Sequence, residues 1–374
     1  MPFKSFKTKI RPNNKQRTLF LKHAGTARHS WNWGLAVCLK ALEAKQKIPS
    51  AIELHRRLVA EVKSANAWYY EVSKCAPQQA LRNLALAFSH WFKVQGRRKP
   101  RFKKKGVKDS FYLEGSISVR GNRIKLPRIG WVKCHEILPS TAPKNVTVSQ
   151  RAGEWYISFK VEFEPQITTK QRDVVGVDVG VNSLATCSDG TVFENARAYR
   201  KAKRRLAHLQ RAVSRKTKGS KNRVKAVKKV SKLHKRISDI RKNALHQVTS
   251  YLAKNHSQIV IEDLNVSGML KNHKLASAIA DCGFYEFRRQ LEYKANWYGS
   301  EVLTANRFYP SSQLCSSCGN RQKMPLKERT YQCGCGLLLD RDLNAAINLE
   351  KTASSAGFAC GGSYQPMASA VGSH

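Results

Sequence analysis

Acidic residues are scarce in this sequence. Its 374 residues include 25 Asp and Glu against 68 Lys and Arg, for a formal net charge of +43 at pH 7. A charge this large exceeds what solubility requires, so we expect a polyanionic partner. A basic packaging protein would share this balance. However, a chain of this length with 41% hydrophobic residues can bury real cores, which a disordered basic tail cannot.

Long apolar runs are also missing. No stretch approaches the ~18 apolar residues that a membrane-spanning helix needs, and the basic segment 1–9 is not followed by the apolar run of a signal peptide. Cysteines that could form a disulfide framework are lacking as well. Most of the ten stand alone, as buried thiols do in a reducing compartment. These single cysteines are Cys38, Cys75, Cys134, Cys187, Cys282 and Cys360. We therefore expect a soluble, intracellular protein without membrane contact.

The few acidic residues include three that stand on or just after apolar segments far apart in the chain. Asp178 interrupts the β-branched run 175–181, where an unpaired buried charge would be costly. Glu262 follows the apolar run 259–261, and an Asp pair, Asp340 and Asp342, follows 337–339. A single carboxylate of this kind is most often structural. Several that converge form an oxygen-rich site suited to Mg²⁺, and two such ions about 4 Å apart support phosphoryl chemistry.

Four cysteines form the clearest metal-binding pattern. Cys315 and Cys318 are separated by two residues in a Cys-x-x-Cys pair, and Cys333 and Cys335 form a tighter Cys-x-Cys pair. Four thiolates in two pairs, each followed by a glycine, are typical of a closed structural Zn²⁺ site. The alternative is that these four cysteines bind no metal. It is less favoured, because the remaining cysteines offer no other pair that could supply the ligands.

The order of these motifs resembles that of the TnpB (OrfB) family of transposon-encoded RNA-guided nucleases, relatives of the type V CRISPR effectors. The resemblance rests on Asp178, on Glu262 and on the ending Asp-Arg-Asp-Leu-Asn-Ala-Ala at 340–346, with the cysteine cluster just before it. It implies that Asp178, Glu262 and Asp342 are the catalytic carboxylates. Asp342 is preferred to Asp340 because the family's third ligand stands two residues before the Asn.

The resemblance also implies a multidomain α/β fold. The expected parts are an N-terminal β-barrel, or wedge, over 1–12 and 97–170; an inserted helical recognition lobe over 13–96; a RuvC-like nuclease of RNase H fold over 171–306 and 337–351; an inserted zinc-ribbon-like element that binds the target nucleic acid over 307–336; and a flexible tail over 352–374. In this family the segment 265–274 forms a lid near the active site, although the residues alone suit an ordinary loop equally well.

The implied activity is Mg²⁺-dependent, RNA-guided cleavage of double-stranded DNA beside a short transposon-adjacent motif. Two Mg²⁺ ions would be catalytic and one Zn²⁺ structural. One copy of the protein would bind a guide RNA from the transposon end, in the cytoplasm of a prokaryote and on the nucleoid when bound to DNA. Two rivals remain: a DNA strand-transfer transposase and a non-cleaving RNA-guided repressor. A plain basic nucleic-acid-binding protein would explain neither the carboxylates nor the cysteines.

Local patterns support this organisation. A strand is expected at 3–10, short strands from 111 to 163, a hairpin turn at 188–190, and a helix from residue 344. The helix expected at 78–94 has Leu81, Leu84, Ala85, Phe88 and Phe92 on one core-facing side. Two long basic helical stretches, 198–215 and 225–255, could form a charged hairpin packed on a sheet. Because few acidic residues are present to pair with these lysines and arginines, binding to a nucleic-acid backbone is favoured.

Two sets of residues are candidates for nucleic-acid contact in the N-terminal half. By the family match, Lys74 and Gln78 face the DNA motif, and both residue types can reach base edges; two surface polar residues on a helix would look the same. The densest basic run, at 97–106, predicts a phosphate-binding loop, although such runs also serve as solvated linkers. Its candidate contacts are Arg97, Arg98, Arg101, Lys103, Lys104 and Lys105.

Overall fold

A computed structural model describes residues 3–325 and 327–354. The chain divides into two compact units, with the boundary between Phe163 and Glu164. The wedge is expected to extend to residue 170. Lys170 Nζ donates hydrogen bonds to Ala253 O at 2.9 Å and Tyr298 O at 2.8 Å. The segment that joins the two units is therefore fastened to the second one.

The first unit contains a seven-stranded antiparallel sheet in the order β2-β6-β7-β1-β5-β4-β3. Its strands are β1 (Phe3–Arg11), β2 (Ser110–Glu114), β3 (Ser118–Arg120), β4 (Arg123–Leu126), β5 (Gly130–Cys134), β6 (Asn145–Arg151) and β7 (Glu154–Glu162). The predicted N-terminal strand is β1, which pairs with both β7 and β5. Thr8 and Ile10 are buried on its core side, whereas Lys7, the residue before Thr8, is exposed on the other side.

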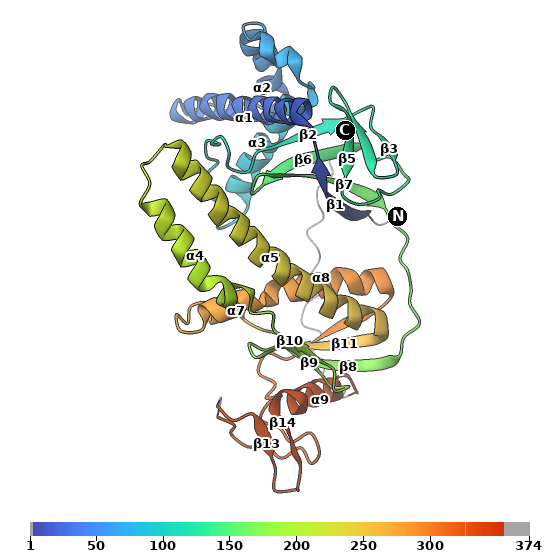
Figure 1. Cartoon of the computed structure of the whole chain (residues 1–374). Coiled ribbons are helices and arrows are strands. Elements are labelled where there is room, and N and C mark those ends of the chain that lie inside the picture. The colour runs from blue at the N-terminus through green and yellow to red at the C-terminus, as the bar shows by residue number, and fades with distance from the viewer. Residues whose placement is uncertain (1–2, 326, 355–374) are drawn as a thin grey trace. The chain divides into compact units, whose positions relative to one another are not determined.

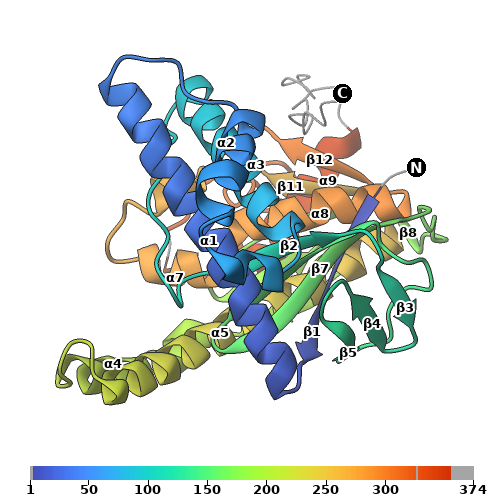
Figure 2. The ribbon, with the colours of Figure 1, turned by 90° about the horizontal axis from the view of Figure 1, so that it is seen from above.

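Helices occupy the sequence between β1 and β2. They are α1 (Asn14–Glu43), α2 (Ala51–Arg57), a π-helical continuation (Leu58–Lys63), a 3₁₀ turn (Ala67–Glu71) and α3 (Cys75–Lys93). The α1 helix starts with a capping box between Asn13 and Gln16, and α1, α2 and α3 lie together (Figure 2). On α3, Leu81, Leu84 and Phe88 are buried as predicted, but Phe92 is 59% exposed. The core face thus ends one turn before the helix does.

The second unit is built on a mixed five-stranded sheet in the order β10-β9-β8-β11-β12. Its strands are β8 (Arg172–Asp178), β9 (Ser183–Cys187), β10 (Val192–Glu194), β11 (His256–Glu262) and β12 (Glu301–Ala305). The first three form an antiparallel meander, whose predicted turn at 188–190 joins β9 to β10. Strand β11 is parallel to β8 on one side and to β12 on the other.

The helices of this unit are α4 (Ala198–Ser214), α5 (Lys221–Asn255), α6 (Val266–Met269), α7 (Ala276–Cys282), α8 (Phe284–Tyr298) and α9 (Arg341–Ser354). Helices α5 and α8 cover one face of the sheet and α9 the other (Figure 1). Val175, Val177 and Ile261 pack in one core with residues of α5 and α8. Val260 packs on the opposite face with Leu349 of α9. Alternation along β8 and β11 therefore assigns each residue to the α5–α8 side or to the α9 side.

A small element precedes α9. It contains the hairpin β13 (Thr330–Gln332) and β14 (Leu338–Asp340) and a core of Cys315, Tyr331 and Cys333. The predicted single thiols at 38, 75, 134, 187 and 282 are all free and buried. The predicted tail begins inside α9, which continues to Ser354; the rest of it, with Cys360, lies outside the described residues. Among the described helices, none is both long and apolar enough to cross a membrane.

Candidate functional site

Asp178 lies where α9 crosses β8 most closely. A Cβ added to Gly176 would stand 1.9 Å from Ala346 O and 2.5 Å from Glu350 N, so only glycine permits this contact. Asp178 is two residues further along the strand and so faces the same side. Asp342 is four residues before Ala346 and so lies on the same side of the helix. The glycine contact thus brings the first and third predicted carboxylates toward one another.

Glu262 joins them from the neighbouring strand. In the parallel pairing, Val260 is opposite Gly176 and Ile261 is opposite Val177, so the next position places Glu262 beside Asp178. Like Val260, it points to the α9 side. Ser311 Oγ donates a hydrogen bond to Glu262 Oε1 at 2.7 Å. The carboxyl ends of two parallel strands and the start of one helix therefore supply the three predicted acids.

Asp342 is held by the start of α9. The predicted helix began at residue 344, but α9 begins at Arg341, because Asp340 acts as its cap. Asp340 Oδ1 accepts hydrogen bonds from the backbone N–H groups of Asp342 at 2.9 Å and Leu343 at 3.1 Å. Such bonds satisfy amide groups that the first helical turn leaves unpaired. Asp340 thus caps the helix terminus, whereas Asp342 faces the other two acids.

The electrostatics of this cluster are unfavourable for three negative charges. Burial raises the pKa of Asp178 well above its usual range, and the charges of Glu262 and Asp342 raise it further, although Arg341 opposes them. Burial and Asp340 also raise the pKa of Asp342, against Arg329 and Arg341. A divalent cation among the carboxylates would favour their ionised forms. The all-oxygen donor set suits a hard cation such as Mg²⁺.

The sequence offered no reason to single out Arg329, which lies at the carboxylate cluster. Its Nη1 is 3.7 Å from Asp342 Oδ1, and its side chain is 54% exposed. The backbone places it there, because Arg341 N donates to Arg329 O at 2.7 Å. One arginine among 68 basic residues carries no distinguishing pattern. Only the folded chain shows that this cation stands beside an acid of the cluster.

The four predicted zinc ligands come together. Their sulfur atoms all lie within 4.8 Å of one another. The Sγ atoms of Cys315 and Cys335 are 3.6 Å apart, as are those of Cys318 and Cys333. Four Zn–S bonds of about 2.3 Å in a tetrahedron require sulfur separations of about 3.8 Å, so the tight Cys-x-Cys pair fits. The described residues contain this one group of His, Cys, Asp or Glu with such metal-ligand spacing.

A cleft of about 620 Å³ lies beside Glu262. The segment predicted as a lid contains α6, which is capped by Asn265, and residues 264–267 line the cleft. Arg288 and Arg307 also line it, and both are ion-paired with Asp263, the residue after Glu262. The cleft thus offers guanidinium groups next to the carboxylate cluster.

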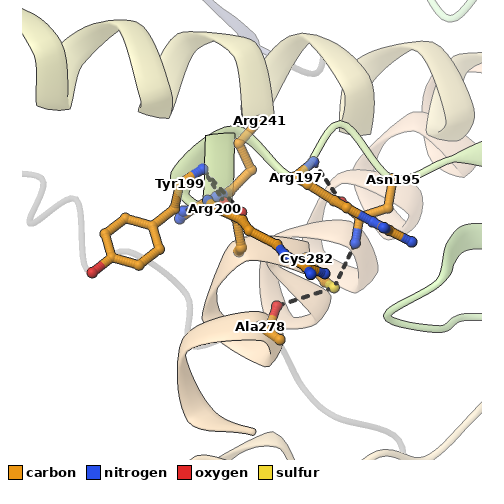
Figure 3. A network of polar contacts seen from close by, with 8 residues as sticks. Asn195, Arg197, Tyr199, Arg200, Arg241, Ala278 and Cys282 are labelled. Atoms are coloured by element: carbon orange, nitrogen blue, oxygen red, sulfur yellow. Dashed lines mark hydrogen bonds and ion pairs between the residues drawn. The ribbon is translucent and has the colours of Figure 1, made fainter. Parts of the chain in front are cut away.

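The two basic helices form a hairpin, with Leu206, Leu233 and Ile237 in their shared core. The α4 helix starts after Arg197, which has a left-handed backbone with φ of 46° and supplies no cap of its own. The cap comes from α7: the Asp281 carboxylate accepts from Tyr199 N at 2.9 Å and from Arg241 Nη2 of α5 at 2.9 Å (Figure 3). One buried acid thus orients the whole hairpin against α7.

The candidate nucleic-acid contacts of the first unit are spread over two places. Lys74 is the exposed N-cap residue of α3, and Gln78 lies half-buried in its first turn. The basic run forms the loop between α3 and β2 and is exposed from Arg97 to Arg98 and from Arg101 to Lys105. It is not a free linker, because Trp31 Nε1 donates to Arg101 O at 3.0 Å and Asn32 Nδ2 donates to Lys103 O at 3.0 Å.

Family models match three parts of the chain. Residues 158–273 match a family described as "Probable transposase", residues 284–349 match "Cas12f1-like, TNB domain", and residues 1–47 match "Helix-turn-helix domain". The first two together contain all three carboxylates and all four clustered cysteines. In the structure, residues 3–43 form one strand and one long helix rather than a helix-turn-helix.

Curated relatives match over nearly the whole chain. A protein of Streptomyces pristinaespiralis named "Putative RNA-guided DNA endonuclease" is 37% identical over 97% of this chain and 92% of its own length. The Escherichia coli (strain K12) protein named "Putative RNA-guided DNA endonuclease InsQ" is 37% identical over 96% and 94%. The solved structure of "the mini-RNA-guided endonuclease CRISPR-Cas_phi3" is 9% identical, with a TM-score of 0.50 over 95% of this chain and 92% of that chain. That likeness is one of fold alone.

Proposed function

Because this chain belongs to the TnpB (OrfB) family, we propose that it is an RNA-guided DNA endonuclease of a transposable element. The observation that carries the proposal is the convergence of Asp178, Glu262 and Asp342 at one edge of the second unit's sheet. This edge offers oxygen ligands, while the basic surface of the hairpin α4–α5 offers binding for a nucleic-acid backbone. In the family's terms, the second unit corresponds to a RuvC-like nuclease of RNase H fold.

The three carboxylates would hold two Mg²⁺ ions, which supply an activated water and a counter-charge for the leaving 3′ oxygen. The chain's own residues prepare that chemistry. Asp178 and Glu262 are fixed by the strands and Asp342 by the helix start, so their relative positions do not depend on a flexible loop. Arg329 stands at the rim and would neutralise charge that develops on the scissile phosphate.

The cysteine site has a different role in this proposal. Cys315, Cys318, Cys333 and Cys335 would bind one Zn²⁺ ion, with all four positions taken by protein, as in structural sites. The element they hold carries Arg329 and leads directly into Asp340 and α9. Zinc would thus stabilise the part of the fold that presents the third carboxylate.

Guide RNA and target DNA would be bound mainly through phosphates, with sequence read by base pairing. The domain assignments remain those of the resemblance. Residues 1–12 and 97–170 would form the wedge, with the sheet of the first unit as its barrel, although 164–170 lie in the second unit. Residues 13–96 would form the recognition lobe, 307–336 the target-binding zinc element, and 265–274 the lid. The proposed contacts in the first unit are Lys74, Gln78, Arg97, Arg98, Arg101, Lys103, Lys104 and Lys105.

A second candidate is DNA strand transfer. The family description "Probable transposase" over residues 158–273 favours it, and the same carboxylate arrangement can serve joining as well as cutting. A strand-transfer enzyme would act on its own transposon ends without RNA. A non-cleaving RNA-guided repressor is disfavoured, because all three acids are present and converge.

The test is to purify the protein from cells that carry its native flanking DNA and to sequence the RNA that copurifies. A discrete RNA whose 3′ end continues past the transposon boundary is expected. That RNA would define a matched DNA target, which the complex should cut only with Mg²⁺ present. Heterogeneous RNA that high salt removes, together with joining of transposon ends by the protein alone, would favour the transposase instead.

A further inference from the structure

One hydrogen bond links the cysteine element to the catalytic cluster. Ser311 stands in the segment between β12 and Cys315, is 3% exposed, and donates from Oγ to Glu262 Oε1 at 2.7 Å. A buried hydroxyl that donates to a carboxylate oxygen at this distance is a well-formed, directional contact. It fixes the carboxylate plane, and it uses one of about four lone-pair sites, so the others remain available to a cation.

Ser311 is itself held by the helix that carries Asp342. Asn348 Nδ2 donates to Ser311 O at 2.8 Å and to Leu314 O at 2.7 Å. Asn344 Nδ2 also donates to Leu314 O, at 2.7 Å, and its Oδ1 accepts from Ser316 N at 2.9 Å. The two asparagines are four residues apart, on one side of α9, and both are buried. They bind the loop 311–316 to α9 through their side-chain amides.

The same loop contains Cys315. Closing the four-cysteine site fixes the backbone of Cys315. It therefore also fixes that end of the loop 311–316, which Asn344 and Asn348 already hold against α9. The described residues thus form a continuous sequence of contacts, from the cysteine cluster through the loop to Ser311 and Glu262. The helix that completes this frame also presents Asp342.

We propose that Ser311 is a positioning residue that orients Glu262 for divalent-cation binding, and that it couples the cysteine site to the carboxylate site. The inference rests on the proposed function, since it assigns Glu262 to the cation. Partners that orient a metal ligand typically change metal affinity by about 10- to 100-fold when removed. Ser311 acts through Glu262 and does not touch the reacting atoms.

The test is Mn²⁺ binding to the zinc-loaded full chain, freed of RNA by high salt and measured by titration calorimetry. Ser311→Ala is expected to weaken Mn²⁺ binding about 10-fold or more, with bound zinc unchanged at one per chain. Ser311→Thr, which keeps the hydroxyl, is expected to bind Mn²⁺ within about threefold of wild type. Ser317→Ala is the matched control, since Ser317 is exposed in the same segment, and it should bind like wild type.

A second measurement separates orientation of Glu262 from general loop stability. Thermal unfolding is followed for Ser311→Ala in the wild-type and in the Glu262→Ala background. If the hydroxyl acts through Glu262, the loss of melting temperature caused by Ser311→Ala should largely disappear when Glu262 is absent. An equal loss in both backgrounds, or wild-type Mn²⁺ affinity in Ser311→Ala, would overturn the inference.

Failure of the inference differs from failure of the proposed function. If Ser311→Ala binds Mn²⁺ normally while Glu262→Ala does not, Ser311 has no positioning role but the carboxylate site stands. If neither Glu262→Ala nor Asp178→Ala changes Mn²⁺ binding, the carboxylates are not the cation site, and both proposals fall together.

Discussion

The second unit holds two clusters of potential metal ligands that are built in opposite ways. The cysteines come from two loops 15 residues apart at their nearest members, Cys318 and Cys333, and form their own small core with Tyr331. The carboxylates come from β8, β11 and α9, and their convergence depends on strand register and on Gly176. The cysteine site stabilises its own small element. The carboxylate site is held together by the larger fold of the second unit, despite the repulsion between its negative charges. Losing ligands should therefore have different consequences at the two sites.

Asp178→Ala should produce the largest effect on cleavage. Removing one ligand from a cluster that acts as a unit is expected to lower the cleavage rate on the order of 10³-fold or more, while RNA and DNA binding stay near wild type. Cleavage of a guide-matched duplex with Mg²⁺ measures this. Asp173→Ala, in the same strand but exposed, is the matched control and should cut normally. Unimpaired cutting by Asp178→Ala would refute the assignment.

Cys333→Ser should affect the fold rather than the chemistry first. Bound zinc should fall from one ion per chain to nearly none, and residues 307–336 should become sensitive to limited proteolysis, because a structural zinc site folds only with its metal. Elemental analysis and protease mapping check this. Cys38→Ala removes a buried thiol of the first unit and should keep one zinc. Full zinc content in Cys333→Ser would mean that this thiol is not a ligand.

Gly176→Ala tests whether the carboxylate site depends on the large fold. Its Cβ would meet the backbone of α9 at 1.9 Å, so strand and helix must separate, at a cost of roughly 3 kcal/mol. Both the melting temperature and the cleavage rate should fall. Gly25→Ala, on α1 with its nearest atom at 3.8 Å, is the control. A normal rate in Gly176→Ala would show that the close contact does not position Asp342.

Asp178→Asn should have the smallest effect. Unlike Gly176→Ala, it should stabilise the folded chain. Since the folded state raises the pKa of Asp178 above its unfolded value, the folded state retains the proton more strongly. This destabilises the folded chain as pH rises through the window between the two values. In magnesium-free buffer at neutral pH, Asp178→Asn should raise the melting temperature by a few degrees. Below the unfolded pKa the gain should vanish. A lowered melting temperature at neutral pH would contradict the repulsion described here.

The contrast also explains what the sequence could predict. The cysteine pairs and the apolar runs beside Asp178 and Glu262, which lie in β8 and β11, are local patterns, and both were identified from the residues. The grouping of the carboxylates was inferred from the family resemblance, since nothing local states that Glu262 pairs beside Asp178. Arg329 and Ser311 were missed because their contacts come from tertiary structure. The start of α9 was placed too late, because the capping bonds that Asp340 accepts were not foreseen from the sequence.

The most direct test of the account is a crystal of the zinc-loaded protein soaked in Mn²⁺, with anomalous scattering measured at the Mn and Zn absorption edges. The account predicts manganese peaks among Asp178, Glu262 and Asp342, and a single zinc peak among Cys315, Cys318, Cys333 and Cys335. Manganese bound elsewhere, with the three carboxylates bare, would contradict the claim that this chain gathers them to hold catalytic cations.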